Sequence, residues 1–244
     1  PLCAPCRASF ITGLMPHQTG VVGNKDPLAP ELKDQAMGHL LRAAGYDCGY
    51  AGKWHIPGAT QEELGFNMLG DEKNDARVPH QCLEFLDRER GNPFLLVASF
   101  YNPHDICQWA RSQPLPQGPV EDVPTEECPS LPLNFAIPPF DAEMLRFEQA
   151  SSPRIYPILS YPDTHWRHYR QAYYRLVEKV DAEIGVLLDG LRASGLEEET
   201  VVIFTSDHGD GQGAHRWNQK TALYEECVRV PFIVSFKGET GAGD

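Results

Sequence analysis

The feature that most constrains the fold is a helix-then-strand order that occurs three times along the chain. Apolar side chains recur at helical spacing before each short apolar run. The expected elements are a helix at 32–44 with a strand at 46–51, a helix at 81–90 with a strand at 94–100, a helix at 165–193 with a strand at 201–205, and a last strand at 230–236. This alternation predicts an α/β fold whose mostly parallel sheet is sandwiched by helices.

Residues 102–164 interrupt this order. They hold 12 of the 21 prolines and show no sustained periodicity. A stretch of that length without regular structure is uncommon in a compact domain and is usually functional. We therefore interpret 1–244 as one catalytic domain, partial in extent, with a long irregular insertion at 102–164. Trp109 in this insertion can line a substrate pocket or belong to the local core.

Composition excludes several classes of protein. The 21 basic and 34 acidic residues give a net charge of −13, which argues against a nucleic-acid partner because phosphate binding needs a basic surface. The longest apolar runs fall well short of the ~20 residues of a membrane-spanning helix. Seven cysteines are too few for a disulfide scaffold, and their odd number leaves at least one unpaired.

Reactive side chains follow three of the predicted strands. Ligands of open α/β sheets bind beyond the carboxyl ends of the strands, so these loops are where a site is expected. The three clusters are Lys53-Trp54-His55, Pro103-His104-Asp105, and Ser206-Asp207-His208-Gly209-Asp210.

Four motifs resemble those of the type I sulfatases, members of the alkaline phosphatase-like superfamily. Residues 3–13 read CAPCRASFITG, which matches the family signature Cys-x-Pro-x-Arg followed by Thr-Gly. Residues 52–55 (GKWH) resemble the second motif and residues 102–104 (NPH) the third. Residues 206–209 (SDHG), 213–215 (GAH) and Lys220 resemble the segment that holds metal and sulfate. The motifs extend over nearly the whole chain in the family's order.

The resemblance implies that Cys3 is converted to formylglycine, an aldehyde that hydrates to a geminal diol. One hydroxyl of the diol can attack the sulfur of the ester. The other hydroxyl can then expel sulfate as the aldehyde re-forms, whereas a thiol would be trapped as a stable adduct. The family also binds one divalent cation, usually Ca²⁺, with Mg²⁺ as another candidate. The resemblance implies Cys3, Asp207 and His208 as its ligands, although calcium prefers oxygen and His208 is therefore the unusual member.

The remaining roles also come from the resemblance. Arg7, one helical turn beyond Cys3, would hold the hydrated aldehyde or a sulfate oxygen. Lys53 would contact formylglycine and sulfate, and His55 would accept a proton from the diol. His104 would act as general acid at the leaving group, although Ile106 stands where the family often has proline. His215 would contact substrate, and Lys220 would be a second lysine on the sulfate.

Other candidates are assigned no catalytic role. Cys6 is interpreted as a small filler and Asp210 is kept out of the ligand set, because an acidic turn with glycines is commonly solvated. Five histidines match no motif and are expected to be structural or exposed, namely His17, His39, His80, His165 and His168.

The sequence therefore predicts a sulfuric ester hydrolase, with a sulfated carbohydrate, small or polymeric, as the expected substrate. Its other expected partner is a formylglycine-generating maturation enzyme. Three alternatives remain: a phosphonate monoester or phosphodiester hydrolase, a non-catalytic protein that binds sulfated glycans, and a thiol protein based on Cys3 and Cys6. Kinship implies export to the periplasm, the cell exterior or the lysosome, with no signal segment in the given sequence.

The two ends look cut from something longer. The sequence starts two residues before Cys3, whereas the family takes two adjacent Asp ligands from a strand that precedes the signature. We therefore expect the given segment to lack that strand and the C-terminal subdomain of the family. On its own, such a segment is expected to bind metal weakly and to hydrolyse nothing measurable.

Overall fold

The structure is a computed structural model that describes residues 1–70, 74–151 and 160–237. The chain divides into two compact units. The sheet unit comprises Leu2–Tyr101, Ala182–Asp207 and the residues from Val230 onward. The insertion unit comprises Pro1, Asn102–Asp181 and His208–Arg229. The interpretation of 1–244 as one partial catalytic domain stays a prediction.

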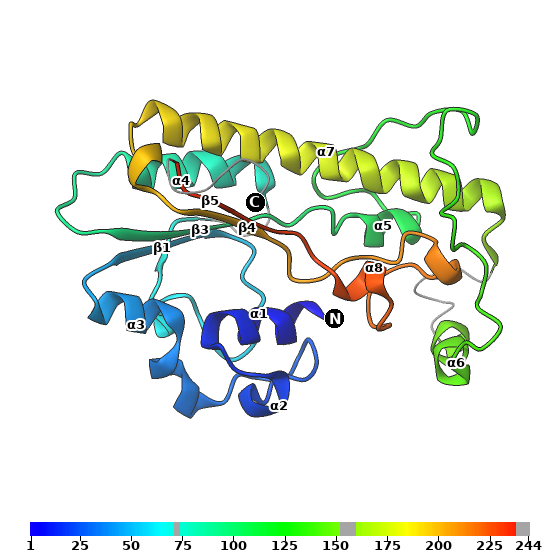
Figure 1. Cartoon of the computed structure of the whole chain (residues 1–244), viewed down its shortest axis with the longest axis horizontal. Helices are drawn as coiled ribbons and strands as arrows, with labels where there is room; N and C mark the ends of the chain where they lie inside the picture. The colour runs from blue at the N-terminus through cyan, green and yellow to red at the C-terminus, as the bar shows by residue number, and fades with distance from the viewer. Residues whose placement is uncertain (71–73, 152–159, 238–244) are drawn as a thin grey trace. The chain divides into compact units, whose positions relative to one another are not determined.

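A parallel sheet of three strands lies at the centre of the sheet unit. β1 (Asp47–Gly52) pairs in parallel with β3 (Phe94–Ser99) (Figure 1). On its other side it pairs in parallel with β2 (Asn67–Met68). The parallel register aligns the carboxyl ends of β1 and β3, with Gly52 opposite Ser99. Residues that follow these two strands therefore start from the same edge of the sheet.

Helices cover both faces of this sheet. Side chains of successive strand residues point to opposite faces, so each strand packs against helices on both sides. Tyr50 and Val97 pack on one face with α1 (Cys3–Thr12) and α3 (Met37–Ala43). Ala51 and its neighbours on the other face pack with α4 (Val78–Leu86) and with the last turns of α7 (Asp163–Ala193) (Figure 1). The predicted α/β class, with a parallel sheet between helices, is confirmed.

Gly52 ends β1 in a conformation that requires glycine. Its φ is +89°, in the left-handed region, and a Cβ there would lie 2.0 Å from the backbone oxygen of Ser99. The next residue, Lys53, donates its backbone N–H to that same oxygen at 2.7 Å. The backbone therefore lies close against the end of β3 where it leaves β1, and this contact fixes the position of the Lys53 backbone.

The strand that precedes Asp207 differs from the prediction. The apolar run 201–205 is typical of a buried strand, but in β4 (Val202–Thr205) Ile203 is 56% exposed and Phe204 40% exposed. Within the described residues β4 pairs in an antiparallel ladder with β5 (Phe232–Ser235), in a sheet separate from β2-β1-β3. An apolar, β-branched run predicts a strand, but its burial depends on neighbours that the run does not specify.

Helix boundaries differ from the prediction in two places in the sheet unit. The expected helix at 81–90 is α4, which begins at Val78 and ends at Leu86. The expected helix at 32–44 is a 3-10 helix, η1 (Pro30–Gln35), followed by α3. Ala36 between them is extended, with ψ 148°. Shorter elements complete the unit: α2 (Pro16–Thr19), η2 (Glu62–Leu64), η3 (Asp75–Arg77) and η5 (Glu197–Glu199).

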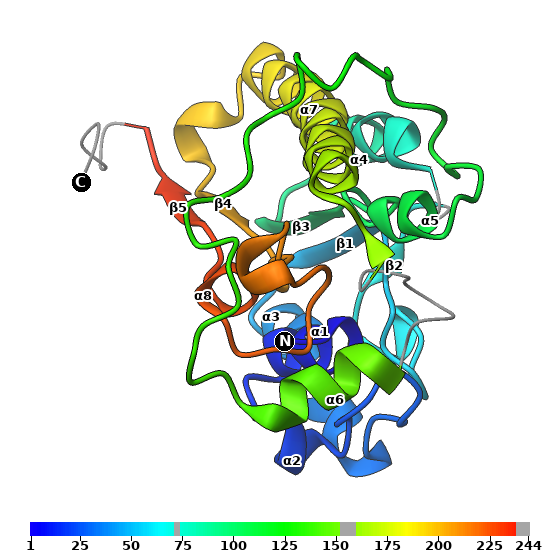
Figure 2. The same ribbon diagram turned by 90° about the vertical axis from the view of Figure 1, so that its right-hand side faces the viewer.

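The insertion unit has an aromatic core of its own. Trp166 and Tyr169, on the first half of α7, are buried with Ile106 and Ala110 of α5 (Ile106–Ala110), and Trp109 and Phe135 pack around them. Figure 2 shows α5 beside α7. The expectation that 102–164 lacks regular structure is wrong, because it contains α5 and α6 (Glu143–Ser151). The two helices are too short to show a sustained helical periodicity, and the many prolines around them are typical of irregular structure. Tyr156, another aromatic residue of this insertion, lies outside the described residues.

The unit is completed by η6 (Ala214–Arg216) and α8 (Glu225–Val228). None of the described helices of the chain is both long enough and apolar enough to span a bilayer.

Candidate active site

Cys3 lies at the first turn of α1, where the sequence places it in a rigid, buried position. Gly13 ends the helix in the left-handed region, with φ 71°, and its N–H donates to Ser9. Pro5 falls in the first turn, where backbone N–H groups have no helical acceptor, so proline costs nothing there. Cys3 is 1% exposed. The helix therefore presents residue 3 and, one turn later, Arg7 on the same side.

Arg7 connects the ends of three strands of the sheet unit. Its Nη1 donates to the backbone oxygen of Lys53 at 2.8 Å and to Ser99 Oγ at 2.9 Å, at the ends of β1 and β3. Its Nε pairs with Asp207 Oδ2, beyond β4, at 3.1 Å. The Arg7 and Asp207 side chains are only 15% and 17% exposed, so this ion pair is largely desolvated.

Tyr50 completes the surroundings of Arg7. Its hydroxyl donates to the Lys53 oxygen at 2.7 Å and accepts from Arg7 Nη1 at 3.3 Å. Burial raises the pKa of Tyr50, and the neighbouring Arg7 charge opposes that rise. The phenol therefore stays protonated at neutral pH and acts as a donor. Tyr50 and Ser99 carried no motif in the sequence, and only their places on strands β1 and β3 could have pointed to them.

Lys53 reaches from the end of β1 toward Cys3. It is 7% exposed, and its Nζ lies 4.0 Å from Cys3 Sγ. The ammonium also lies 5.1 Å from the centre of the Tyr101 ring, a cation–π contact that offsets part of the cost of burying the charge. Trp54, between Lys53 and His55, packs into the core and donates its indole N–H to the backbone oxygen of Ala59. His55 is half-buried and adopts a left-handed φ of 57°.

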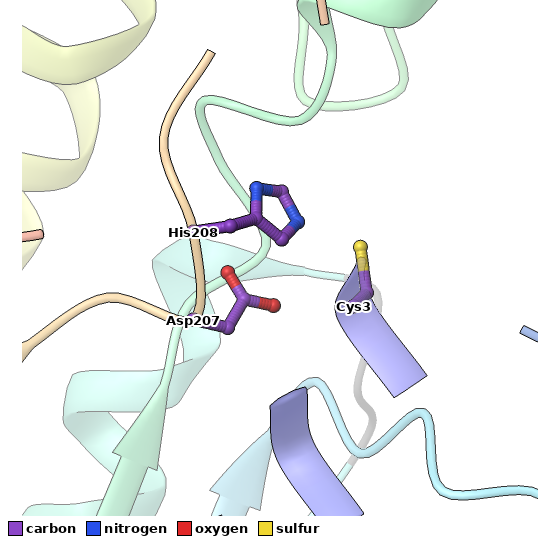
Figure 3. Close-up of side chains that lie close together, drawn as sticks. All are labelled: Cys3, Asp207 and His208. Atoms are coloured by element: carbon purple, nitrogen blue, oxygen red, sulfur yellow. The ribbon is translucent and has the colours of Figure 1, made fainter. Parts of the chain in front are cut away.

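Figure 3 shows Cys3 and Asp207 with their side chains next to each other. A carboxylate oxygen of Asp207 and Cys3 Sγ are within 4.8 Å of one another. His208 is the next residue along the chain and is the first of this segment in the insertion unit. Arg7, Lys53, Asp207 and Cys3 thus form one cluster within the sheet unit.

The donors present fit a divalent cation in part. Asp207 offers a carboxylate, and conversion of Cys3 would put oxygen in place of a sulfur that suits softer metals. Calcium takes 6–8 oxygens, so these two side chains would hold it only as part of a larger ligand set. The assignment of Cys3, Asp207 and His208 as ligands stays a prediction.

The remaining predicted residues lie in the insertion unit. His104 is half-buried in the turn before α5. His215, half-buried, packs its ring on Tyr224 at 4.4 Å between ring centres, and its backbone N–H donates to Asn134 at 2.8 Å. Lys220 is half-buried at the end of the same loop, where its backbone oxygen accepts from Trp217 Nε1 at 3.3 Å. Their roles stay predictions.

Asp210 is buried, contrary to the solvated acidic turn that we expected. It is 7% exposed, and both its carboxylate oxygens accept from the hydroxyl of Tyr169 on α7, at 3.0 and 3.1 Å. Burial raises its pKa, while the N–H of Gln212, the Tyr169 hydroxyl and the charge of Lys220 oppose that rise. Burial and the Asp210 charge together raise the pKa of Tyr169 well above its usual range, so the hydroxyl stays a donor. Tyr169 had no sequence signal beyond its place on the apolar face of a helix.

Comparison with known proteins agrees with these motifs. The sequence model of the family described as Sulfatase matches residues 1–242. The chain is 27% identical to a Delta 4,5-hexuronate-2-O-sulfatase of Bacteroides thetaiotaomicron over 98% of its own length and 53% of that protein. It is 28% identical to an ulvan-active sulfatase of Formosa agariphila over 98% of its own length and 47% of that protein.

A solved structure of a Bacteroides thetaiotaomicron sulfatase superposes with a TM-score of 0.81 at 26% identity, over 98% of this chain and 55% of the other. The chain therefore spans about half the length of the curated relatives that it matches.

Proposed function

The chain belongs to the sulfatase family, and on this premise we propose that the protein hydrolyses a sulfate ester at Cys3. The observation that carries the proposal is the cluster in the sheet unit. There Lys53 Nζ lies 4.0 Å from Cys3 Sγ. Arg7 donates to the Lys53 backbone and forms an ion pair with Asp207, so it connects both residues to the helix that bears Cys3. Helix α1 and two strand ends thus fix one buried sulfur beside one buried cation.

The charges of this cluster suit an anionic ester. A buried ammonium beside the reacting atom stabilises negative charge more strongly than it would in water, because water does not screen it. Lys53 would therefore bind a sulfate oxygen and resist displacement, since its own backbone is held by Ser99. This local positive charge is compatible with a net charge of −13, because binding of a small anion depends on the groups within a few ångströms.

Formylglycine at position 3 would supply a diol as nucleophile, and a divalent cation held by Asp207, His208 and residue 3 would polarise the sulfate. Around these groups the chain's own residues have separate tasks. Arg7 holds Asp207 and the Lys53 backbone in place. Lys53 binds the anion, with Lys220 as a second cation. His55 would accept a proton from the diol at its imidazole.

The substrate that we propose is a sulfated carbohydrate. Its support is the description of the relatives: one is a hexuronate-2-O-sulfatase and another acts on ulvan. His215 would contact the sugar, because it lies on the loop that carries Lys220 and its ring is held against Tyr224.

The test is sulfate release by the intact protein, produced together with a formylglycine-generating enzyme. Nitrophenyl sulfate, sulfated disaccharides with 2-O, 6-O or N-sulfate groups, and a matched nitrophenyl phosphodiester would be compared on one preparation. We expect sulfate to be released from the aryl ester and from at least one disaccharide. Turnover of the phosphodiester alone, or of none of these esters, would contradict the proposal.

His104→Ala is expected to slow hydrolysis of sugar sulfates about 10²–10⁴-fold, the usual worth of general acid catalysis. Nitrophenyl sulfate should lose far less, because nitrophenolate leaves without a proton. The measurement is kcat/KM on both substrates. His80→Ala is the control, since His80 is exposed on α4 and has no proposed role. Equal losses on both substrates would show that His104 positions the substrate and does not protonate the leaving group.

A further inference from the structure

The insertion unit contains a cavity of about 420 Å³ between helix α7 and the loop that follows α5. Three segments of the chain line it, and the lining includes Trp109 of α5, Glu121 and Asp122 of the loop, and His165, His168 and Gln171 of α7. All of these residues belong to the insertion unit. The volume lies within the range of sites for small molecules, so the cavity can hold a ligand.

Gln171 places a side-chain amide in the wall of this cavity. The residue is only 9% exposed, and its side chain has no hydrogen-bond partner among the described residues. Polar groups buried to this extent are normally hydrogen-bonded, because leaving one unpaired costs free energy. A side-chain amide has both donors and acceptors to satisfy. A group that completes Gln171 from the cavity must therefore be able both to donate and to accept.

The loop wall of the cavity is held in place from both helices. The ammonium of Lys179 on α7 donates to the backbone oxygens of residues 117–119 at 2.7–3.1 Å. On the α5 side, the N–H of Gln117 donates at 2.8 Å to the carboxylate of Asp105, which is fully buried. The cavity is therefore formed before any ligand arrives, and binding would not have to order this part of the loop.

His168 forms part of the wall and has both ring nitrogens occupied. Its Nε2 lies 3.0 Å from Thr125 Oγ1, and its Nδ1 lies 3.4 Å from Cys128 Sγ and 3.4 Å from Asp122 Oδ1. These contacts come from the chain itself, so His168 orients the loop. The Asp122 side chain is 93% exposed, and Glu121 beside it is exposed as well. The rim of the cavity therefore carries two carboxylates.

Trp109 supplies apolar surface to the cavity. It is half-buried, and its ring packs against that of His165 at 4.9 Å between ring centres. Burial and the nearby His168 lower the pKa of His165, so that imidazole is uncharged at neutral pH. Trp109 thus belongs to the local core and also lines a cavity, where an aromatic surface stands beside the amide of Gln171.

This lining selects one class of ligand. A sugar ring has C–H groups that pack on aromatic side chains, and hydroxyls at its edge that both donate and accept. Such hydroxyls match the amide of Gln171 and the carboxylates at the rim. The charges of Glu121 and Asp122 disfavour a sulfated sugar, because like charges repel. An ammonium group would satisfy the carboxylates but has no acceptor for the amide N–H of Gln171.

We propose that this cavity of the insertion unit binds a neutral sugar ring, with Gln171 hydrogen-bonded to its hydroxyls and Trp109 packed on its C–H groups. The carboxylates of Glu121 and Asp122 accept from further hydroxyls. Binding here cleaves no bond and uses residues of the insertion unit alone. The inference therefore goes beyond the proposed function and does not depend on it.

The experiment is a titration of the intact protein with methyl α-glucoside and methyl β-galactoside, followed by saturation-transfer NMR. Ethanolamine and glucose 6-sulfate are the comparison ligands, and all titrations use the Cys3→Ala background so that no sulfate ester is consumed. Gln171→Met keeps the length of the side chain but removes the amide. Gln149→Met is the matched control, because Gln149 is also a buried glutamine of this unit, 4% exposed, but donates to the Arg216 oxygen at 2.7 Å.

We expect millimolar binding of at least one hexoside, weakened about 10-fold by Gln171→Met and unchanged in Gln149→Met. Affinity for glucose 6-sulfate should not respond to Gln171→Met. The Tm of Gln171→Met should equal or exceed that of the parent protein, because its amide has no hydrogen bond to lose. Gln149→Met should lower the Tm, because it loses the bond to Arg216.

Glu121→Gln tests the rim without a change in packing, because this side chain is exposed. It should weaken hexoside binding about 3-fold. Its control is Glu126→Gln, which is exposed on the same loop but does not line the cavity and should be silent. Equal hexoside affinity in these two variants would overturn the proposal.

Three further results would overturn it. They are the absence of hexoside binding, equal hexoside affinity with and without the Gln171 amide, and binding of ethanolamine alone. A Tm of Gln171→Met that falls as far as that of Gln149→Met would show that the amide serves the fold, and it would overturn the proposal as well.

Discussion

Cys3→Ala is expected to abolish sulfate ester hydrolysis and to leave the fold intact. Alanine is the best helix former, so α1 keeps its first turn, and the change removes one sulfur from a site that is 1% exposed. Removal of a catalytic nucleophile costs on the order of 10⁶-fold in kcat. The measurements are turnover of nitrophenyl sulfate and the thermal unfolding midpoint. Wild-type activity in this variant would disprove the assignment of residue 3 as nucleophile.

Cys6→Ala is the matched control, because it makes the same change one turn along the same helix. Cys6 is half-buried. We expect nearly full activity from it. In the active protein, residue 3 should be about 18 Da lighter than cysteine, since conversion to formylglycine exchanges two hydrogens and a sulfur for an oxygen. Complete loss in Cys6→Ala would instead favour a thiol pair.

Arg7→Ala is expected to cause the largest combined loss of stability and activity. The variant leaves Asp207 without its ion-pair partner in a site where both side chains are more than four-fifths buried, and it removes a donor to Lys53 and Ser99. Breaking a buried ion pair in this way costs about 3 kcal/mol of unfolding free energy. Because Lys53 and Asp207 both lose their common support, kcat should fall at least about 10²-fold. Urea unfolding and aryl sulfate turnover measure the two effects.

Two variants separate the geometry of Arg7 from its charge. Arg7→Lys keeps the charge but loses the planar guanidinium, whose Nε pairs with Asp207 while Nη1 donates to Lys53 and Ser99, so we expect it to recover part of the stability and little of the activity. Arg192→Ala removes an ion pair with Asp189 in which the two side chains are 62% and 77% exposed. It should change the free energy of unfolding by less than about 1 kcal/mol. Full activity in Arg7→Lys would show that a single positive charge near Asp207 suffices.

The parts of the fold and site that the sequence predicted are those set by local spacing. The i, i+4 relation of Cys3 and Arg7 follows from helix geometry and holds in α1. The placement of Lys53 at a strand end, with Trp54 packed beside it, follows from the apolar run before it and from the glycine at position 52. Periodicity over a long segment also gave α7 to within a few residues.

What the sequence did not predict depends on contacts between distant segments. The hydrogen bonds of Arg7 to Tyr50 and Ser99 require the parallel register of β1 with β3, which no local pattern specifies. The burial of Asp210 depends on Tyr169, 41 residues earlier in the chain. The exposure of Ile203 in β4 depends on which strands pair with it. In each case the residue type was visible, but its partner was not.

The left-handed turn at Gly52 has a consequence for engineering this protein. Because any side chain at position 52 would occupy the space of the Ser99 carbonyl, random mutagenesis with selection for activity should return glycine there in every survivor. Redesign that shifts Lys53 to suit an ester of a different shape therefore cannot begin with a substitution at position 52. It has to begin on β3, where Ser99 lies opposite Gly52 and its backbone oxygen accepts from the N–H of Lys53.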